Sequence, residues 1–191
     1  MRDTLPNISL EEKIQLVGNP VDMLRNAPLG PYQFPIEPQF TNWLDEQEAW
    51  RKGAVLFDQS YHMTDHYIEG PDTRKLIESL AVNSMKNWSR NVAKQVVFCS
   101  YDGYVVGDGI MFILEDDRVN IVNKPINRNW VQFHAETGGF DVLTKTDSRA
   151  LDNDGSRLRY RFEVQGPNAW EILERLNDQP ITGWKFFGMG E

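Results

Sequence analysis

Cysteine is nearly absent from this sequence, and its scarcity removes whole classes of protein. The 191 residues include a single cysteine, Cys99. One cysteine excludes an intrachain disulfide and a zinc site built from several thiolates. Cys99 itself lies in an apolar stretch, which favours a buried and inert thiol over a nucleophile.

Long apolar runs and basic clusters are missing as well. No segment approaches the ~20 apolar residues that cross a bilayer, and the opening residues lack the basic-then-apolar order of a secretion signal. Lys and Arg number 20 against 28 Asp and Glu, which gives a net charge of −8. Because an acidic chain repels phosphate groups, nucleic acid and anionic membranes are poor partners. We therefore predict a cytoplasmic protein that binds a small molecule.

Large aromatic side chains are plentiful by contrast. The sequence has 6 Trp, 10 Phe and 6 Tyr, and 40% of its residues are hydrophobic. These values are typical of a globular protein of one domain or slightly more. The aromatic residues indicate either a core of bulky side chains or a pocket for a flat ligand.

The first 41 residues differ in character from the rest. Ser9 begins an S-x-x-E capping box, which predicts a short helix that continues to Val17. Four prolines then fall between residues 28 and 38 and exclude a helix there. We predict an N-terminal helix and Pro-rich arm over residues 1–41, followed by a domain over residues 42–191. A linker is the alternative to the arm, but the aromatic residues of this stretch favour the arm.

The second region alternates between helical and extended patterns, with Asp102-Gly103 as a hairpin turn. The helices are predicted at residues 41–52, with Thr41 as the N-cap, at 72–80 and at 127–137. The strands are predicted at 54–60, 62–69, 94–100, 104–114, 118–123, 140–146 and 158–165. Residues 149–157, RALDNDGSR, are predicted to form an exposed loop.

A strand–Gly-Pro–helix unit occurs twice. YIEGPDTRKLIESL and FEVQGPNAWEILERL align with an offset of 96 residues, so that Gly70 matches Gly166. Glycine permits a tight exit from the strand, proline suits the first helical turn, and Asp or Asn caps it. The repeat predicts an α+β fold made of duplicated modules with antiparallel sheets. Only DQPITGWKFFGMGE follows the second helix, so we expect the second module to be incomplete, or truncated.

Several segments in the same order resemble one family. They are the two Gly-Pro units, the hairpin DGYVVGDGIMF, YQFP at Tyr32, FTNWLDEQEAW and NWVQFHAETGGFDV. Together they resemble the folate-binding aminomethyltransferases, which include the T-protein of the glycine cleavage system. The similarity is nearest to O-demethylases that act on methoxylated aromatic acids such as vanillate and syringate.

The resemblance implies tetrahydrofolate as cofactor and an aromatic methyl ether as methyl donor. N5 of tetrahydrofolate would accept the methyl group, so neither a metal nor oxygen is needed. Such relatives are longer than this chain. Their second half, a C-terminal barrel, an acidic residue that holds the pterin and a tyrosine implicated in methyl transfer would all follow Glu191. We therefore expect the isolated chain to be inactive.

The resemblance also assigns roles to the substrate side of the site. Tyr32 and His62 are the candidate catalytic residues, because hydrogen-bond donors near the ether oxygen stabilise the departing phenolate. Gln59 would bind substrate beside His62. Lys124 would meet a substrate carboxylate, although it offers a point charge where arginine would bind with two bonds. The alternatives are an aromatic anchor for Tyr32, a polar turn for Gln59 and His62, and an ordinary surface charge for Lys124.

Asp108 and Gln165 are the candidate cofactor-binding residues. Asp108 lies between two glycines, which allow a ligand to approach the backbone. The T-protein has an acidic pair here, whereas this sequence has Gly107 and Asp108, a departure that argues against glycine cleavage. Gln165 would face the folate channel. The alternative for Asp108 is a solvent-facing side chain in a β-bulge. The alternative for Gln165 is simply the last residue of a strand.

A metal site is not expected. His62 and His66 are four residues apart, but the segment is predicted to be a strand, where such side chains stand ~13 Å apart. No third ligand accompanies them.

Two further functions remain open. One is a sulfonium or aminomethyl one-carbon transferase of the same family. The other is a non-catalytic ligand-binding or interaction protein derived from a truncated transferase module. An incomplete sheet would leave unpaired edge groups, so self-association or a completing partner chain is also predicted.

Overall fold

The computed structural model describes residues 9–21, 40–149, 153, 156–178, 180–181 and 185–190. The chain divides into two compact units, residues 1–33 and 34–191. The predicted boundary after residue 41 stays a prediction. Tyr32 lies outside the described residues.

The described part of the first unit contains helix α1 (Leu10–Val17). The Ser9 hydroxyl accepts a hydrogen bond from the Glu12 backbone N–H at 3.2 Å, and the Glu12 carboxylate accepts one from the Ser9 N–H at 2.8 Å. The predicted capping box is therefore confirmed. The pattern was readable from the sequence because both of its bonds are local.

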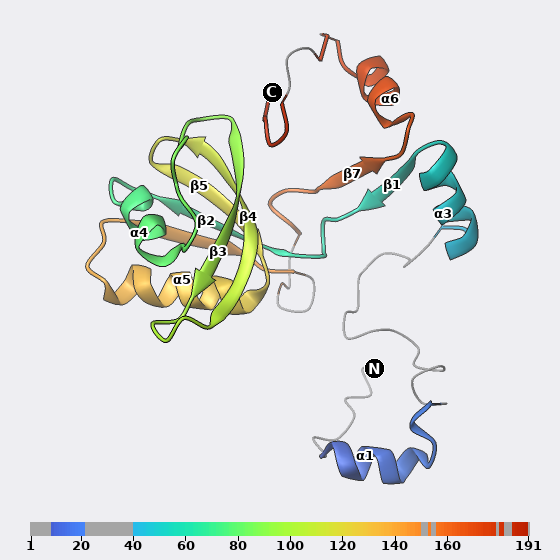
Figure 1. The fold of residues 1–191 in the computed structure, drawn as a ribbon, viewed down its shortest axis with the longest axis horizontal. Coiled ribbons are helices and arrows are strands. Elements are labelled where there is room, and N and C mark those ends of the chain that lie inside the picture. Colours follow the sequence, from blue (N-terminus) through green and yellow to red (C-terminus); the bar gives the residue numbers. More distant parts are fainter. Residues whose placement is uncertain are drawn as a thin grey trace. The chain divides into compact units, whose positions relative to one another are not determined.

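The second unit combines a five-stranded and a two-stranded antiparallel sheet (Figure 1). The strand orders are β3-β4-β5-β2-β6 and β1-β7. The helices are α3 (Trp43–Lys52), α4 (Thr73–Leu80), α5 (Pro125–Thr137) and α6 (Ala169–Leu176). The strands are β1 (Val55–Asp58), β2 (Thr64–Glu69), β3 (Val92–Cys99), β4 (Val105–Glu115), β5 (Arg118–Asn123), β6 (Leu143–Asp147) and β7 (Phe162–Gln165). The predicted α+β fold with antiparallel sheets is confirmed.

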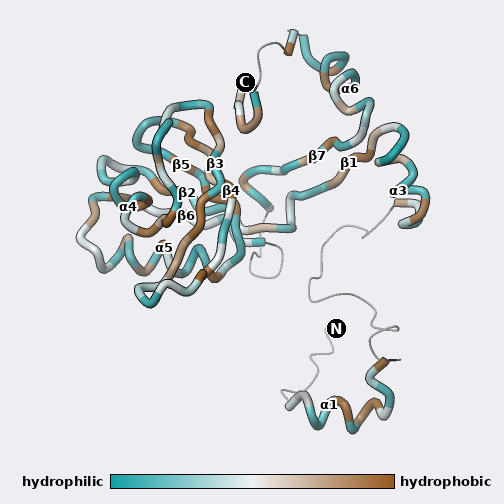
Figure 2. The backbone as a smooth tube through the Cα atoms, in the orientation of Figure 1, coloured by the Kyte–Doolittle hydropathy of each residue, from teal (hydrophilic) through white to brown (hydrophobic). Residues whose placement is uncertain are grey.

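The hydrophobic core lies on one face of the five-stranded sheet, beneath α4 and α5. Alternate residues of the strands point into it, as the period of two requires, and hydrophobic colouring runs along these strands in Figure 2. The fully buried apolar side chains come from the sheet and from both helices: Ile68, Leu76, Ile77, Val96, Phe98, Met111, Ile113, Val119, Ile121 and Val131. No helix in the described part of the chain has both the length and the apolar character needed to cross a bilayer.

Several predicted boundaries differ from those of the structure by one to four residues, and two of the differences have a clear physical cause. Asn42, not Thr41, caps α3, because its side-chain oxygen accepts hydrogen bonds from the N–H groups of Leu44 and Asp45, both at 3.0 Å. The last strand is shorter than residues 158–165. At Arg161 the carbonyl still accepts a hydrogen bond from the Gln59 N–H at 2.8 Å, but the Arg161 N–H donates to the Ser60 hydroxyl at 3.0 Å and not to a backbone carbonyl.

The two Gly-Pro turns have the same three-dimensional construction. Gly70 has φ 145° and Gly166 has φ 133°, a region that L side chains rarely adopt. A Cβ atom on Gly70 would lie 2.4 Å from the Asp141 carbonyl oxygen, and one on Gly166 would lie 2.3 Å from that of Gly53. Each glycine is therefore required by its conformation and by the close approach of a second backbone segment.

The strands around these turns repeat as well. β2 pairs with β6, placing Glu69 opposite Leu143, and β7 pairs with β1, placing Gln165 opposite Val55. β6 is therefore the strand partner in the first module that β1 is in the second. The structure supports the internal duplication at the level of register, not only of sequence.

Candidate functional site

Gln59 and His62 lie together in the segment that joins β1 to β2. The Nδ1 atom of His62 and the side-chain oxygen of Gln59 are 2.7 Å apart. Because an amide oxygen only accepts, the His62 Nδ1–H donates this bond. In the neutral ring Nε2 therefore carries no hydrogen and can accept a hydrogen bond. In the charged ring Nε2 also carries a hydrogen and donates one.

Glu163 on β7 connects this pair to Gln165. Its carboxylate accepts a hydrogen bond from the Gln59 amide at 3.2 Å and another from the Gln165 amide. Glu163 and Gln165 are two residues apart on one strand, so their side chains share a face. The structure therefore brings together three predicted site residues around a carboxylate that sequence reasoning missed. The period-two spacing before Gln165 was the signal that could have identified Glu163.

Asp108 and Lys124 lie at the end of the five-stranded sheet where β2 begins. Gly109 of β4 and Thr64 of β2 both pair with Asn123, the last residue of β5. Asp108 precedes Gly109 and Lys124 follows Asn123. Both are therefore next to the paired residues Gly109 and Asn123. Each is exposed, and the Asp108 carboxylate accepts a hydrogen bond from the Gln95 amide at 3.0 Å.

The glycines on either side of Asp108 have a packing role. A Cβ atom on Gly107 would lie 2.0 Å from the side-chain oxygen of Asn127, and one on Gly109 would lie 2.9 Å from Cβ of Asn123. The expected reason for these glycines was the approach of a ligand to the backbone. The structure shows that they leave room for two buried asparagines, and the approach of a ligand stays a prediction.

A buried ionic cluster joins the segment before β7 to the five-stranded sheet. The Asp65 carboxylate accepts hydrogen bonds from Arg157 at 2.6 Å, from Arg161 at 2.7 Å and from the Asn120 amide at 2.7 Å. Arg157 also donates to the backbone oxygen of Asp147 at 2.9 Å. The prediction that Arg157 belongs to an exposed loop was wrong, because only 4% of this residue is exposed. The cluster holds the Gln59–Glu163 region beside the sheet.

His66 does not join His62 in a common site. It lies on the helix-covered face of β2, where its Nε2 is 3.2 Å from the side-chain oxygen of Gln132. Burial lowers the pKa of His66 to about 4, with a further lowering by the charge of Arg128, and the contact with Gln132 opposes both effects. Among the described residues, no group of three or more His, Cys, Asp or Glu side chains is placed to hold a metal ion.

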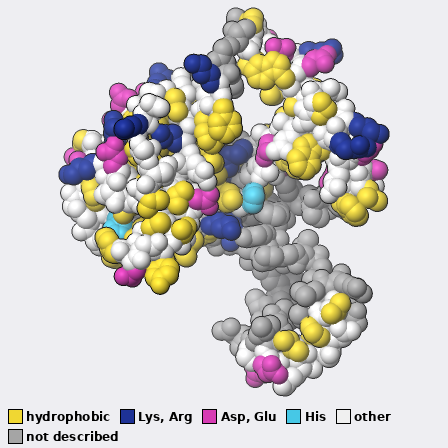
Figure 3. All heavy atoms as spheres, in the orientation of Figure 1, with side chains coloured by type: hydrophobic (Ala, Val, Ile, Leu, Met, Phe, Trp, Pro, Cys, Tyr) yellow, Lys and Arg dark blue, Asp and Glu magenta, His cyan; other side chains and the backbone are white. Residues whose placement is uncertain are grey.

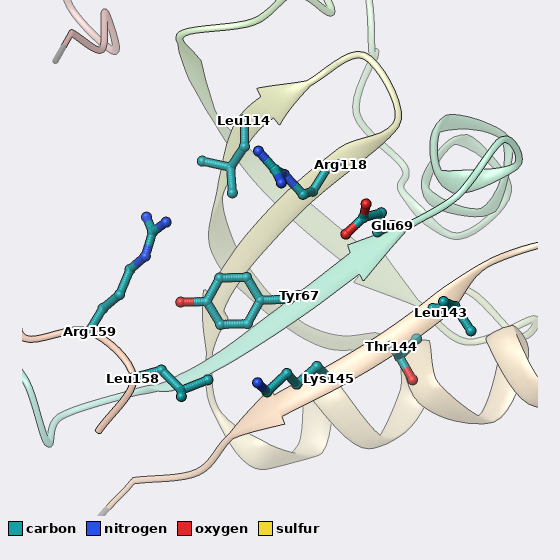
Figure 4. A pocket seen from close by; sticks show the side chains of 9 residues that line it. All are labelled: Tyr67, Glu69, Leu114, Arg118, Leu143, Thr144, Lys145, Leu158 and Arg159. Atoms are coloured by element: carbon teal, nitrogen blue, oxygen red, sulfur yellow. The ribbon is translucent and has the colours of Figure 1, made fainter. Parts of the chain in front are cut away.

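A pocket of about 370 Å³ lies elsewhere on the sheet, and Figure 4 shows its lining. None of the predicted site residues lines it. Three cationic side chains, those of Arg118, Lys145 and Arg159, accompany one carboxylate, that of Glu69, a balance that favours an anionic ligand. Desolvation is the main cause that raises the pKa of Tyr67, and the nearby charge of Asp65 raises it further.

Comparison with known proteins agrees with this fold. The family model of the GCVT N-terminal domain matches residues 28–191, so the chain belongs to that family. A syringate O-demethylase of Sphingobium sp. is 44% identical over 185 residues, which cover 96% of this chain and 40% of the relative. An aminomethyltransferase of Corynebacterium aurimucosum is 31% identical over 152 residues, covering 78% of this chain and 38% of the relative.

A solved structure shows the same fold. The glycine cleavage system aminomethyltransferase T of Bartonella henselae superposes with a TM-score of 0.61 at 19% identity, over 76% of this chain and 37% of that one. The chain therefore spans about 40% of the length of the curated relatives that it matches.

Proposed function

We propose that this chain is the N-terminal part of a tetrahydrofolate-dependent methyltransferase that O-demethylates a methoxylated aromatic acid. The observation that carries the proposal is the cluster of Gln59, His62, Glu163 and Gln165, in a chain 44% identical to a syringate O-demethylase. In the overall reaction the aryl ether loses its methyl group and becomes a phenol, while the N–H at N5 of the cofactor becomes N–CH₃. Atoms and charge balance without a metal or an oxidant.

The side chains of the cluster suit the substrate step. Because Nδ1 of His62 is engaged by Gln59, the ring presents Nε2 to a ligand. A protonated Nε2 would donate to the ether oxygen as negative charge develops there, which lowers the barrier to methyl departure. Lys124 would attract the substrate carboxylate as a point charge. Tyr32, as the second proposed catalytic residue, would add a hydroxyl donor.

The donor set also fits a folate. A pterin ring presents adjacent ring N–H and amino groups, which a carboxylate with neighbouring amides can bind. Glu163 between Gln59 and Gln165 would supply such a set. Asp108, on the five-stranded sheet, is the proposed second carboxylate for the cofactor. When bound, tetrahydrofolate would provide N5 as the methyl acceptor.

Calorimetric titration tests the proposal. We expect saturable binding of tetrahydrofolate that weakens at least about tenfold in Glu163→Gln and Gln165→Ala, each having lost one charged or bidentate contact. Syringate binding should weaken in His62→Ala and Lys124→Ala. Asp102→Asn, an exposed carboxylate-to-amide change in the β3–β4 hairpin, is the control and should bind as the parent does.

Two outcomes would contradict the site. A folded chain that binds neither ligand would remove the site from these residues. Binding that is unchanged in Glu163→Gln and His62→Ala would place the ligands elsewhere on the chain.

A further inference from the structure

The pocket in Figure 4 lies on the face of the five-stranded sheet that points away from α4 and α5. Tyr67 and Glu69 line it, and they alternate along β2 with Ile68, which is buried in the core on the helix-covered face. Tyr67 pairs with Lys145 of β6, and Glu69 pairs with Arg118 of β5. Strand register therefore fixes which side chains meet in this pocket.

One end of the pocket is electrically balanced. The Arg118 guanidinium is 3.6 Å from the carboxylate of Glu115, and Glu69 occupies the position opposite Arg118 on β2. Leu114 and Leu143 add apolar side chains to the lining here (Figure 4). A charged group of a ligand would gain little at this end, whereas an apolar group would pack on the two leucines.

The other end carries two cations without an opposing carboxylate. Lys145 lies opposite Tyr67, and the Arg159 guanidinium is 6.0 Å from the centre of the Tyr67 ring. In the described part of the chain neither cation takes part in an ion pair. Asp65 and Asp147, two positions along the strands from Tyr67 and Lys145, are already paired within the buried ionic cluster. This end of the pocket therefore favours negative charge.

The unopposed cations are a local feature of this pocket. The chain as a whole has a net charge of −8, and Figure 3 shows Lys and Arg intermixed with Asp and Glu over the visible face of the molecule. The Tyr67 hydroxyl is buried beside the two cations and has no hydrogen-bond partner among the described residues. The composition of the chain does not account for such an arrangement, but the binding of an anion would.

We propose that this pocket binds a small organic monocarboxylate, whose carboxylate is held by Lys145 and Arg159. Its apolar body lies against the leucines of the lining, Leu114, Leu143 and Leu158. The volume of about 370 Å³ falls in the range of small-molecule sites. The inference does not rest on the proposed function, because none of the residues assigned to methyl transfer lines this pocket.

The two ends of the pocket select this class of ligand together. An inorganic anion would use the cations but leave the leucines in water, and a neutral apolar molecule would desolvate the cations without compensation. A second carboxylate would meet Glu69 and Glu115 at the balanced end. A molecule with one carboxylate and an apolar body satisfies both ends.

Calorimetric titration with benzoate tests the proposal. Benzoate should bind saturably and more weakly as salt is added, and benzamide, which has a similar shape but no charge, should bind at least about tenfold more weakly. Lys145→Gln and Arg159→Gln should each weaken benzoate binding about fivefold, because each removes one of two charges at a partly exposed site. Lys86→Gln is the matched control, since Lys86 is exposed, lies outside the pocket and carries the same charge.

A double variant separates this pocket from the proposed substrate site. In His62→Ala/Lys124→Ala the benzoate binding that depends on Lys145 should persist. Benzoate binding that is lost in this double variant but unchanged in Lys145→Gln would overturn the proposal, because the acid would then occupy the other site. Four further results would also overturn it: no saturable binding, equal binding of benzamide, equal binding of inorganic phosphate, or equal weakening by Lys86→Gln.

Discussion

The two strand–Gly-Pro–helix units have the same backbone but different burial. Gly70 and Gly166 have similar positive φ angles, and each turn lies against the backbone carbonyl two residues before a partner strand. Yet α4 packs on a five-stranded sheet, while α6 has no buried residue. Turn and helix formation are therefore local properties of the sequence, whereas burial depends on strands far away in the chain. The predictions below test how far this separation holds.

The largest effect is expected where the two modules meet. Asp65→Ala would remove the nearer carboxylate partner of the buried Arg157 guanidinium, at 2.6 Å, and leave only that of Asp147, at 3.5 Å. Loss of one partner from a buried ion pair costs about 3–5 kcal/mol. Urea denaturation measures the change in the free energy of unfolding. Asp102→Ala, in an exposed turn, should change it little. A loss below about 1 kcal/mol for Asp65→Ala would show that the cluster does not hold the modules together.

Matched truncations in α4 and α6 sharpen the comparison. Leu76→Ala should cost about 2–5 kcal/mol, because it leaves a cavity in a closed core. Ile172→Ala, its equivalent, should cost less than about 1 kcal/mol, because its side chain is already partly in water. The same urea experiment measures both. Equal losses would mean that α6 is buried in solution.

The pH dependence of stability tests the core of the first module. The pKa of His66 is lowered from 6.5 to about 4 in the folded chain. Above pH 6.5 both states are neutral at this residue and it has no effect. As pH falls from 6.5 toward 4, the unfolded state binds a proton that the folded state does not, so stability falls by up to about 3 kcal/mol.

His66→Gln isolates that contribution from the carboxylates that titrate in the same range. The fall in unfolding free energy between pH 7 and pH 4.5 should be smaller in this variant than in the parent. Parallel pH profiles for the two proteins would show that His66 titrates normally and is not buried as a neutral ring.

The smallest effect is expected at the start of α3, next to the second module. Asn42→Ala removes the side chain that caps the helix and should cost about 1 kcal/mol. Thr41→Ala should be close to neutral, because its side chain makes no capping bond to α3. Helical content and urea midpoints measure both. The reverse order would restore the sequence-based assignment of Thr41 as the cap.

Local signals in the sequence predicted most of the fold. The Ser9 capping box and the two Gly-Pro turns depend on residues within a few positions of one another, so their chemistry was readable directly. Asn42 was missed because Thr and Asn are both good caps, and the sequence does not say which residue is the first helical one. Arg157 was missed because its partner, Asp65, lies 92 residues away.

The candidate site was predictable only in part. Gln59, His62 and Gln165 were identified individually, but their connection through Glu163 required the register of β1 and β7. Asp108 and Lys124 were placed at one end of the sheet by the pairing of three strands. The roles of all these residues in binding remain predictions, as does that of Tyr32.

Hydrogen exchange of the chain alone, measured by mass spectrometry, compares the two modules most directly. The amides of α4 should exchange slowly, by global unfolding, because the helix is covered by a closed core. The amides of α6 should exchange much faster, through local opening, since none of the residues of this helix is buried. Equal protection of α4 and α6 at all protein concentrations would contradict the difference between the modules.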